Sequence, residues 1–208
     1  MAASTSALAD GAFEGPWVGA GMGFRGTNTE LTDNNDGVDI NGIGKTSIYG
    51  VVQGGWGWKL NSDVGDFNVG PYAQYFIGTV TSNTHVVGNP ATNAGAFSAN
   101  VKWKNQFQIG FQPGYYLGKD TVVYAKVGYS HVSIELNGAN ANGQVSNSQS
   151  FSGPGAGLGL KTQFAGNWVI FVEAQQIWYS SKDYNIRGVS VQVKPTMSMG
   201  TFGIGYQF

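Results

Sequence analysis

The chain has 208 residues, of which 41% are hydrophobic, 13% aromatic and 11% charged, and its formal net charge is −1. The near-neutral charge excludes the basic surface of a nucleic-acid-binding protein, and the lack of cysteine excludes disulfides, thiolate catalysis and cysteine-based metal sites. The longest apolar run, residues 168–172, is far shorter than the ~20 residues of a membrane-spanning helix. A low charge, many aromatics and short apolar runs instead predict a transmembrane β-barrel, whose strands alternate between lipid and lumen.

The first residues precede the predicted strands. Ala7-Leu8-Ala9 resembles a signal-peptidase site with Asp10 as the first mature residue, although no basic or apolar region precedes it. We expect residues 1–9 to be the remnant of a signal peptide or a flexible tail. Residues 10–208 are expected to form a single outer-membrane β-barrel domain.

Alternation of apolar and polar residues with a period of two predicts eight strands. They cover about residues 17–27, 45–58, 67–81, 100–117, 121–136, 151–164, 168–179 and the C-terminal segment that ends at Phe208. In the fourth, we expect Trp103, Phe107 and Ile109 to face lipid, and Lys102, Lys104, Gln106 and Gln108 to face the lumen. This alternation is too long for an ordinary strand of ~5–6 residues, which supports a membrane crossing.

Two positions interrupt the pattern. Pro71 cannot donate a hydrogen bond to a neighbouring strand. Beyond His131 the apolar residues change parity to Val132, Ile134 and Leu136. We expect a β-bulge or a weakly paired position near Pro71, and near His131 a bulge or a strand that continues above the lipid.

The connectors alternate strictly between short and long. Those at 60–66, 118–120 and 165–167 are short, whereas those at 27–44, 82–99, 137–150 and 180–191 are long and rich in Asn, Gly, Ser and Thr. Outer-membrane barrels have short periplasmic turns and long extracellular loops. The pattern therefore predicts a closed, antiparallel, up-and-down all-β barrel of eight strands, with long loops outside and both termini in the periplasm.

The tryptophans fall where the two membrane interfaces are expected. An aromatic girdle is predicted from Trp17, Trp56, Trp58 and Trp168 near the periplasmic ends, and from Trp103 and Trp178 towards the outer ends.

The end of the chain carries the most specific motif. Phe202, Ile204, Tyr206 and Phe208 occupy every second position, which resembles the C-terminal assembly signal of bacterial outer-membrane proteins. From about residue 15 to residue 208 the chain resembles the small barrels of the OmpA transmembrane, OmpX and porin-opacity type, and segments 124–129 and 153–159 are typical of them. This resemblance implies an integral protein of the bacterial outer membrane. It also implies contact with outer-membrane lipid and lipopolysaccharide, and with the barrel assembly machinery during biogenesis.

Four charged residues are predicted to face the lumen. They are Arg25, Lys126, Lys161 and Glu173, and Glu173 is placed to bridge both lysines with Arg25 higher on the first strand. We interpret them as a buried ion network that plugs the lumen, because leaving such a charge unpaired costs roughly 3–5 kcal/mol. The alternative is a gate in a narrow pore.

His131, Ser133 and Glu135 are candidates for a hydrolase site. These residue types form nucleophilic triads, and lipid A deacylases of the PagL type carry a His-x-Ser motif. In that family, however, the motif lies near the C-terminus, whereas 75 residues follow Ser133 here. We therefore expect a polar strand end without catalysis.

No metal or cofactor site is expected. His85 and His131 lie on different segments, and Asp33, Asp36 and Asp39 lack the register of a calcium loop.

The sequence thus predicts a non-enzymatic structural or surface-interaction scaffold. It would present the four loops at 27–44, 82–99, 137–150 and 180–191 to a surface partner, with no nucleic acid among its partners. One alternative is a narrow channel or an OmpW-like conduit for small molecules. The other is a lipid A-modifying hydrolase that uses His131 and Ser133.

Overall fold

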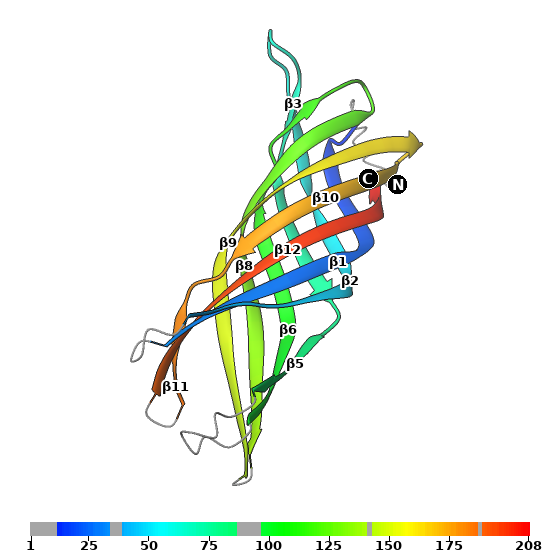
Figure 1. Ribbon diagram of the computed structural model, residues 1–208. Coiled ribbons are helices and arrows are strands. Elements are labelled where there is room, and N and C mark those ends of the chain that lie inside the picture. Colours follow the sequence, from blue (N-terminus) through cyan, green and yellow to red (C-terminus); the bar gives the residue numbers. More distant parts are fainter. Residues whose placement is uncertain (1–11, 34–38, 87–96, 141–142, 187–188) are drawn as a thin grey trace, which may run out of the picture.

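The computed structural model describes residues 12–208 except 34–38, 87–96, 141–142 and 187–188, and it consists of antiparallel strands and turns (Figure 1). Among the described residues no helix is long and apolar enough to span a membrane. The strands are β1 (Gly15–Asp33), β2 (Asp39–Leu60), β3 (Phe67–Val69), β4 (Pro71–Ile77), β5 (Val80–Val86), β6 (Phe97–Phe111), β7 (Gly114–Tyr116), β8 (Thr121–Asn140), β9 (Gly143–Ala165), β10 (Trp168–Trp178), β11 (Lys182–Ile186) and β12 (Val189–Gln207).

The strands close into a ring. β1 pairs with β2 on one side and with β12 on the other, and antiparallel ladders join each remaining neighbour. Because β3 and β4 form one wall segment and β6 and β7 another, the described residues give a ring of eight segments. The predicted closed, eight-stranded, up-and-down barrel is confirmed.

Period-two alternation explains why these segments are strands. In β10, exposed and inward-facing positions alternate along all eleven residues, from Trp168 to Trp178. Ile170 and Val172 face outward and are about half exposed. Phe171 and Glu173, which alternate with them, face inward and are 6% exposed. A strand with apolar residues outside and a carboxylate inside suits a wall with lipid on one side and a packed lumen on the other.

Both ends of the described chain lie at the end that carries the short turns (Figure 1). The backbone N–H of Phe208 donates to the carbonyl of Pro16, and that of Gln207 donates to the carbonyl of Asn167 in the β9–β10 turn. The three short connectors predicted at this end are confirmed, because strands end and begin on either side of each of them.

The long connectors differ from the prediction of loops. The β8–β9 ladder continues to the pair Asn140–Gly143, so most of the segment 137–150 is a β-hairpin. The other three long connectors likewise consist largely of strand in their described parts. Their many Asn, Ser and Thr residues are typical of loops, but the ladders of the barrel wall continue through them.

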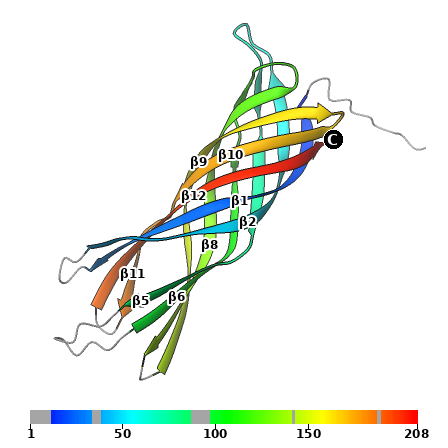
Figure 2. The ribbon, with the colours of Figure 1, turned by 45° about the vertical axis from the view of Figure 1, so that its right-hand side comes forward.

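The hairpins form two separate four-stranded sheets. Their orders are β11-β12-β1-β2 and β5-β6-β8-β9. The β2–β4 ladder ends at Gly50–Ile77 and the β9–β10 ladder at Gly155–Ile177. Beyond these pairs, no ladder in the described part of the chain joins β2 to β5 or β9 to β11, and the two groups of strands diverge (Figure 2).

A β-bulge at Asn105 corrects two predictions. On β6, Asn105 and Gln106 together oppose the single residue Val132 of β8, and Asn105 has φ 50°. The extra residue reverses the facing of the part of β6 that precedes it, so Trp103 points inward and Lys104 outward, opposite to the prediction. Beyond the bulge, Gln106 and Gln108 face inward and Phe107 and Ile109 outward, as predicted. Of the two alternatives expected beyond His131, the continuing strand is confirmed: β8 keeps its alternation and runs to Asn140, and the bulge lies on its neighbour β6, opposite Val132.

The irregularity near Pro71 lies one residue earlier. Gly70 separates β3 from β4, and Pro71 begins β4 opposite Phe111. A Cβ added at Gly70 would lie 1.6 Å from the carbonyl oxygen of Trp56, so only glycine fits this close approach.

The bulge predicts how substitutions at Asn105 affect stability. Asn and Gly tolerate the left-handed conformation, whereas a β-branched residue is strained in it. We expect Asn105→Gly to leave the free energy of unfolding almost unchanged, and Asn105→Val to lower it by about 1–2 kcal/mol. Reversible urea unfolding in lipid vesicles, followed by tryptophan fluorescence, measures both. Equal stability of the two variants would contradict the left-handed conformation at this position.

Candidate functional site

The middle of the lumen contains a buried ion pair. The Nζ atom of Lys126 lies 2.8 Å from Oε1 and 2.9 Å from Oε2 of Glu173, and the side chains are 0% and 1% exposed. Lys126 also donates to the Oε1 atoms of Gln53 and Gln74, at 2.7 Å and 2.8 Å. Glu173 accepts a hydrogen bond of 2.7 Å from the Tyr124 hydroxyl. This full set of partners offsets the cost of removing both charges from water.

Glutamine side chains extend the ion pair across the lumen. Gln74 of β4 donates to Gln108 of β6 at 2.6 Å and to Gln175 of β10 at 3.1 Å. Gln175 in turn donates to Oε2 of Glu173 at 3.2 Å. We call the set Lys126, Glu173, Gln53, Gln74, Gln108 and Gln175 the polar layer. It links strands on opposite sides of the ring through hydrogen bonds between buried side chains.

Lys161 lies apart from the carboxylate that was predicted to pair with it. Its ammonium donates to Oδ1 of Asn68 at 3.0 Å and lies 4.7 Å from the ring centroid of Phe13 and 5.6 Å from that of Tyr124. The only ion pair of Glu173 in the described residues is with Lys126. The predicted bridge from Glu173 to both lysines is therefore not formed.

Arg25 belongs to a different part of the lumen. Its guanidinium donates to the carbonyl of Gly78 at 2.8 Å and, at 3.3 Å each, to Gln106 and Ser47. It also lies 5.7 Å from the ring centroid of Tyr49. Arg25 thus holds β1 against the point where β4 ends, and it does not join the Lys126–Glu173 pair as predicted.

A plug that the sequence analysis missed closes the turn end of the lumen. Phe13 is 1% exposed, and its ring packs 6.2 Å from that of Tyr116. The Tyr116 hydroxyl donates to the carbonyl of Ala12, and Asn68 donates to the carbonyl of Phe13 at 3.0 Å. We call Phe13 and the residues around it the turn-end plug: Tyr116, Val122, Tyr124 and Val169. Its only signal in the sequence was a single apolar residue just before the first strand.

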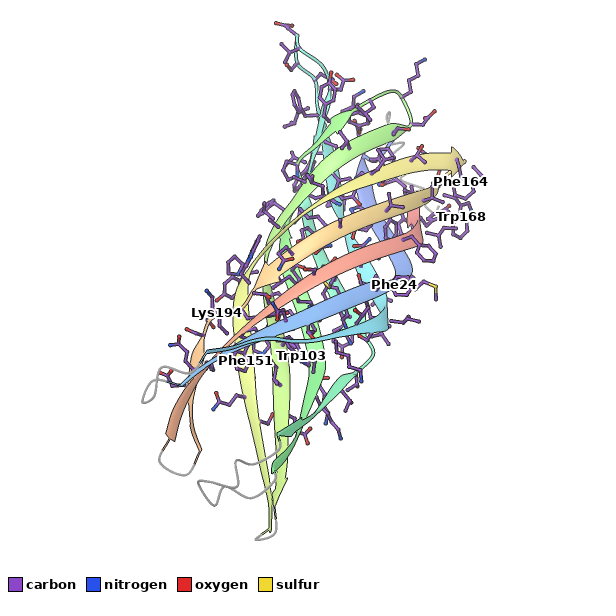
Figure 3. The ribbon with its side chains drawn as sticks, viewed as in Figure 1. Phe24, Trp103, Phe151, Phe164, Trp168 and Lys194 are labelled. Carbon is purple, nitrogen blue, oxygen red and sulfur yellow. The ribbon has the colours of Figure 1, made fainter. Side chains whose placement is uncertain are left out.

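Above the polar layer the lumen is filled by apolar side chains. Trp103 is 2% exposed and contacts Tyr179 edge-on at 5.9 Å between ring centroids. We call the cluster the apolar layer: Tyr49, Val51, Phe76, Trp103, Val132, Ile134, Phe151, Ile177, Tyr179, Met197 and Met199. The parity change beyond His131 has its cause here, because Val132 and Ile134 face an interior that has become apolar. Trp103 and Phe151 lie where the two sheets diverge (Figure 3).

A small cavity lies between the polar layer and the turn-end plug. This cavity of about 20 Å³ lies beside Glu173, Gln53 and Phe13. This volume admits one or two water molecules. The lumen is therefore closed by side chains, as expected for a ring of eight strands.

The outer face of the wall is apolar and ends in aromatic residues. Phe164 and Trp168 lie together at the turn end (Figure 3), and Trp168 contacts Tyr206 edge-on. Four predicted girdle residues face outward at 45–49% exposure: Trp56, Trp58, Trp168 and Trp178. The other two do not. Trp103 is buried in the apolar layer, and Trp17 is half-buried and lines the small interior cavity.

The C-terminal residues proposed as an assembly signal lie on the outer face of β12. Phe202, Ile204 and Phe208 are 45–58% exposed, and Tyr206 is half-buried between Trp168 and Phe208. β12 pairs with β1 and β10, so it is the segment that completes the ring.

The candidate hydrolase residues do not form a triad. Nδ1 of His131 lies 2.8 Å from the hydroxyl oxygen of Ser152, and Glu135 forms an ion pair with Lys104. Ser133 occupies the next outward position on β8. Asp36 lies outside the described residues, and within the described part no three His, Cys, Asp or Glu side chains gather as metal ligands.

The chain matches the family model described as the outer membrane protein beta-barrel domain over residues 1–208. It belongs to this outer-membrane β-barrel family. Among solved structures, OprG from Pseudomonas aeruginosa is 16% identical with a TM-score of 0.56, over 95% of this chain and 98% of that one. Ail of Yersinia pestis is 14% identical with a TM-score of 0.39, over 91% and 99%. The likeness to OprG supports the barrel fold alone, and no curated protein sequence matches the chain. Family membership places this barrel in the bacterial outer membrane.

The polar layer predicts a large loss of stability when its ion pair is broken. Glu173→Gln leaves a buried ammonium without a counter-charge, so we expect the free energy of unfolding to fall by roughly 3–5 kcal/mol. Lys126→Met combined with Glu173→Gln removes both charges and should recover most of this loss. Urea unfolding in lipid vesicles gives the comparison. A double variant no more stable than the single one would show that the charges act independently.

Proposed function

We propose that this barrel is a non-enzymatic scaffold that presents its hairpins at the outer surface of the outer membrane. The observation that carries this proposal is the closed lumen, because three layers of side chains occupy the path that a solute would take. A protein of this family without a transport path must act through its surfaces. The outer rim and the hairpins carry polar residues, which distinguishes them from the apolar wall that faces lipid.

The two four-stranded sheets support the scaffold role. Each is built from ladders that continue from the membrane-spanning wall, so backbone pairing holds the described parts of the hairpins in register with the barrel. Rigid elements hold a binding surface at little entropic cost. The strands at the borders of the sheets also carry backbone groups that an extended segment of a partner can pair with.

The scaffold proposal includes an orientation, with the short turns and the C-terminus in the periplasm and the hairpins outside. Supporting it is the difference in length between the two sets of connectors, which outer-membrane barrels share. The exposed aromatic face of β12 supports recognition by the assembly machinery from the same side.

A conduit for small apolar molecules is a second candidate. Two observations favour it: the apolar layer near the outer end of the lumen, and the lack of a ladder between β2 and β5 among the described residues beside it. An apolar molecule would enter the layer between the sheets and leave sideways into the lipid. Uptake of a fluorescent alkane by proteoliposomes, compared with empty vesicles, distinguishes the two functions.

The closed lumen predicts that the protein does not conduct ions. Purified, refolded protein in planar bilayers should show no stepwise current at any applied voltage up to membrane rupture. A porin reconstituted in parallel shows that insertion and recording work. Reproducible single-channel steps from the purified barrel would contradict the scaffold proposal.

The orientation predicts which introduced cysteines can be labelled. The chain has no cysteine, so a thiol reagent can label a single-cysteine variant only at the introduced residue. Ser148→Cys in the β8–β9 hairpin should react with a membrane-impermeant maleimide on intact cells. Asp63→Cys in the β2–β3 turn should react only after the outer membrane is permeabilised. Labelling of Asp63→Cys on intact cells would reverse the assignment of the two ends.

A further inference from the structure

The outer surface of β6, β8 and β9 changes from apolar to polar within one step along the strands. Ile109, Tyr129 and Pro154 form the last apolar row, since Tyr129 is paired with the other two in the ladders. The next row, Phe107, His131 and Ser152, is mixed, and His131 is hydrogen-bonded to Ser152. Polar residues that begin at one level on three neighbouring strands mark the edge of the lipid band.

Two lysines lie on the same surface above this edge. Lys104 is paired in register with Ser133, which is paired with Ser150, and in the row beyond Lys102 is paired with Glu135. The Asn105 bulge is the reason that both lysines face outward rather than into the lumen. We call this surface the rim patch: Lys102, Lys104, His131, Ser133, Glu135, Ser150 and Ser152.

The charge and position of the rim patch suit an anionic group. Lys104 forms an ion pair with Glu135, and its side chain remains 44% exposed. Two lysines against one glutamate leave a net positive charge, and Ser133, Ser150 and Ser152 lie in the same or the neighbouring row. Each row adds about 7 Å along a strand, or about 5 Å of height in a tilted barrel. The patch therefore spans the headgroup layer, which is roughly 5–8 Å thick on each side of the hydrocarbon.

We propose that the rim patch binds the phosphate of a phosphorylated lipid headgroup in the outer leaflet. Lys104 and Lys102 supply the positive charge, and the serine hydroxyls donate hydrogen bonds to the phosphate oxygens. Phe107 and Tyr129 below them contact the upper part of the acyl chains. This proposal rests on the membrane position of the barrel and the outward orientation of the hairpins, but not on whether the lumen conducts.

The chain offers a matched control for the lysines. Lys194 is an exposed lysine on the outer face of β12, and it lies on the other four-stranded sheet. Its register partner on β1 is Glu30. Removing it changes the net charge of the protein in the same direction without touching the rim patch.

Binding of lipid A to the full chain in maltoside micelles tests the proposal. Native mass spectrometry or microscale thermophoresis gives the dissociation constant. We expect bisphosphorylated lipid A to bind more tightly than enzymatically dephosphorylated lipid A. Lys102→Ala with Lys104→Ala should weaken binding about tenfold, since each cation near an anionic surface contributes of the order of a few-fold. Lys194→Ala should leave it unchanged, and retained heat-modifiable migration on gels verifies that each variant is folded.

Glu135→Gln separates an anion site from a surface ion pair. If Lys104 serves a phosphate, removing the competing carboxylate should leave lipid A binding equal or tighter. If Lys104 serves only Glu135, this variant should behave like the loss of Lys104. The proposal is overturned by equal binding of both lipid forms, by equal effects of the rim and Lys194 variants, or by weaker binding of Glu135→Gln. None of these results depends on conductance, and labelling at Ser148→Cys tests the orientation separately.

Discussion

Every backbone N–H and C=O that faces hydrocarbon must find a partner within the protein, because lipid offers none. The closed ring satisfies this constraint, since β1 pairs with both β2 and β12 and the described wall segments form a ring without an open edge. Closure also sets the width of the lumen, and a ring of eight leaves room only for side chains. The same ladders continue beyond the lipid, and there the wall separates into two sheets. Outside the hydrocarbon, water can form hydrogen bonds with the unpaired backbone groups at the edges of these sheets.

The narrow lumen explains why buried charges are tolerated in this protein. Lys126 and Glu173 lie opposite glutamines from other strands, and together they satisfy nearly every polar atom at that level. The Tyr72 hydroxyl is an exception, a buried polar atom without a hydrogen-bond partner beside the Lys126 ammonium. The apolar layer on one side and the turn-end plug on the other separate the pair from bulk water. The interior thus fastens strands to one another across the ring, which suits a scaffold better than a pore.

The sequence was sufficient to predict the ring, its short turns and the facing of most strands, because period-two alternation reports directly on lipid and lumen. The sequence prediction failed in β6, where one extra residue shifts the alternation between lipid-facing and lumen-facing positions. The bulge at Asn105 reversed the facing of Trp103 and Lys104, and no local pattern distinguishes that asparagine from its neighbours. The partners of Lys161 and Arg25 could not be predicted either. Two lumen side chains meet only if they lie at the same height along the barrel, and that height depends on the stagger between strands that are far apart in sequence. The turn-end plug was missed because Phe13 precedes the first strand, where the alternation of apolar and polar residues cannot indicate which way a side chain points.

Quenching of single tryptophans by brominated lipid tests most directly that lipid and lumen alternate around this closed ring. Two variants each keep one tryptophan, Trp103 or Trp178, with phenylalanine at the other five positions. The account predicts strong quenching of Trp178, which is 45% exposed on the outer face, and almost none of Trp103, which is 2% exposed inside. Equal quenching of both would contradict it, because Trp103 would then face the same acyl chains as Trp178.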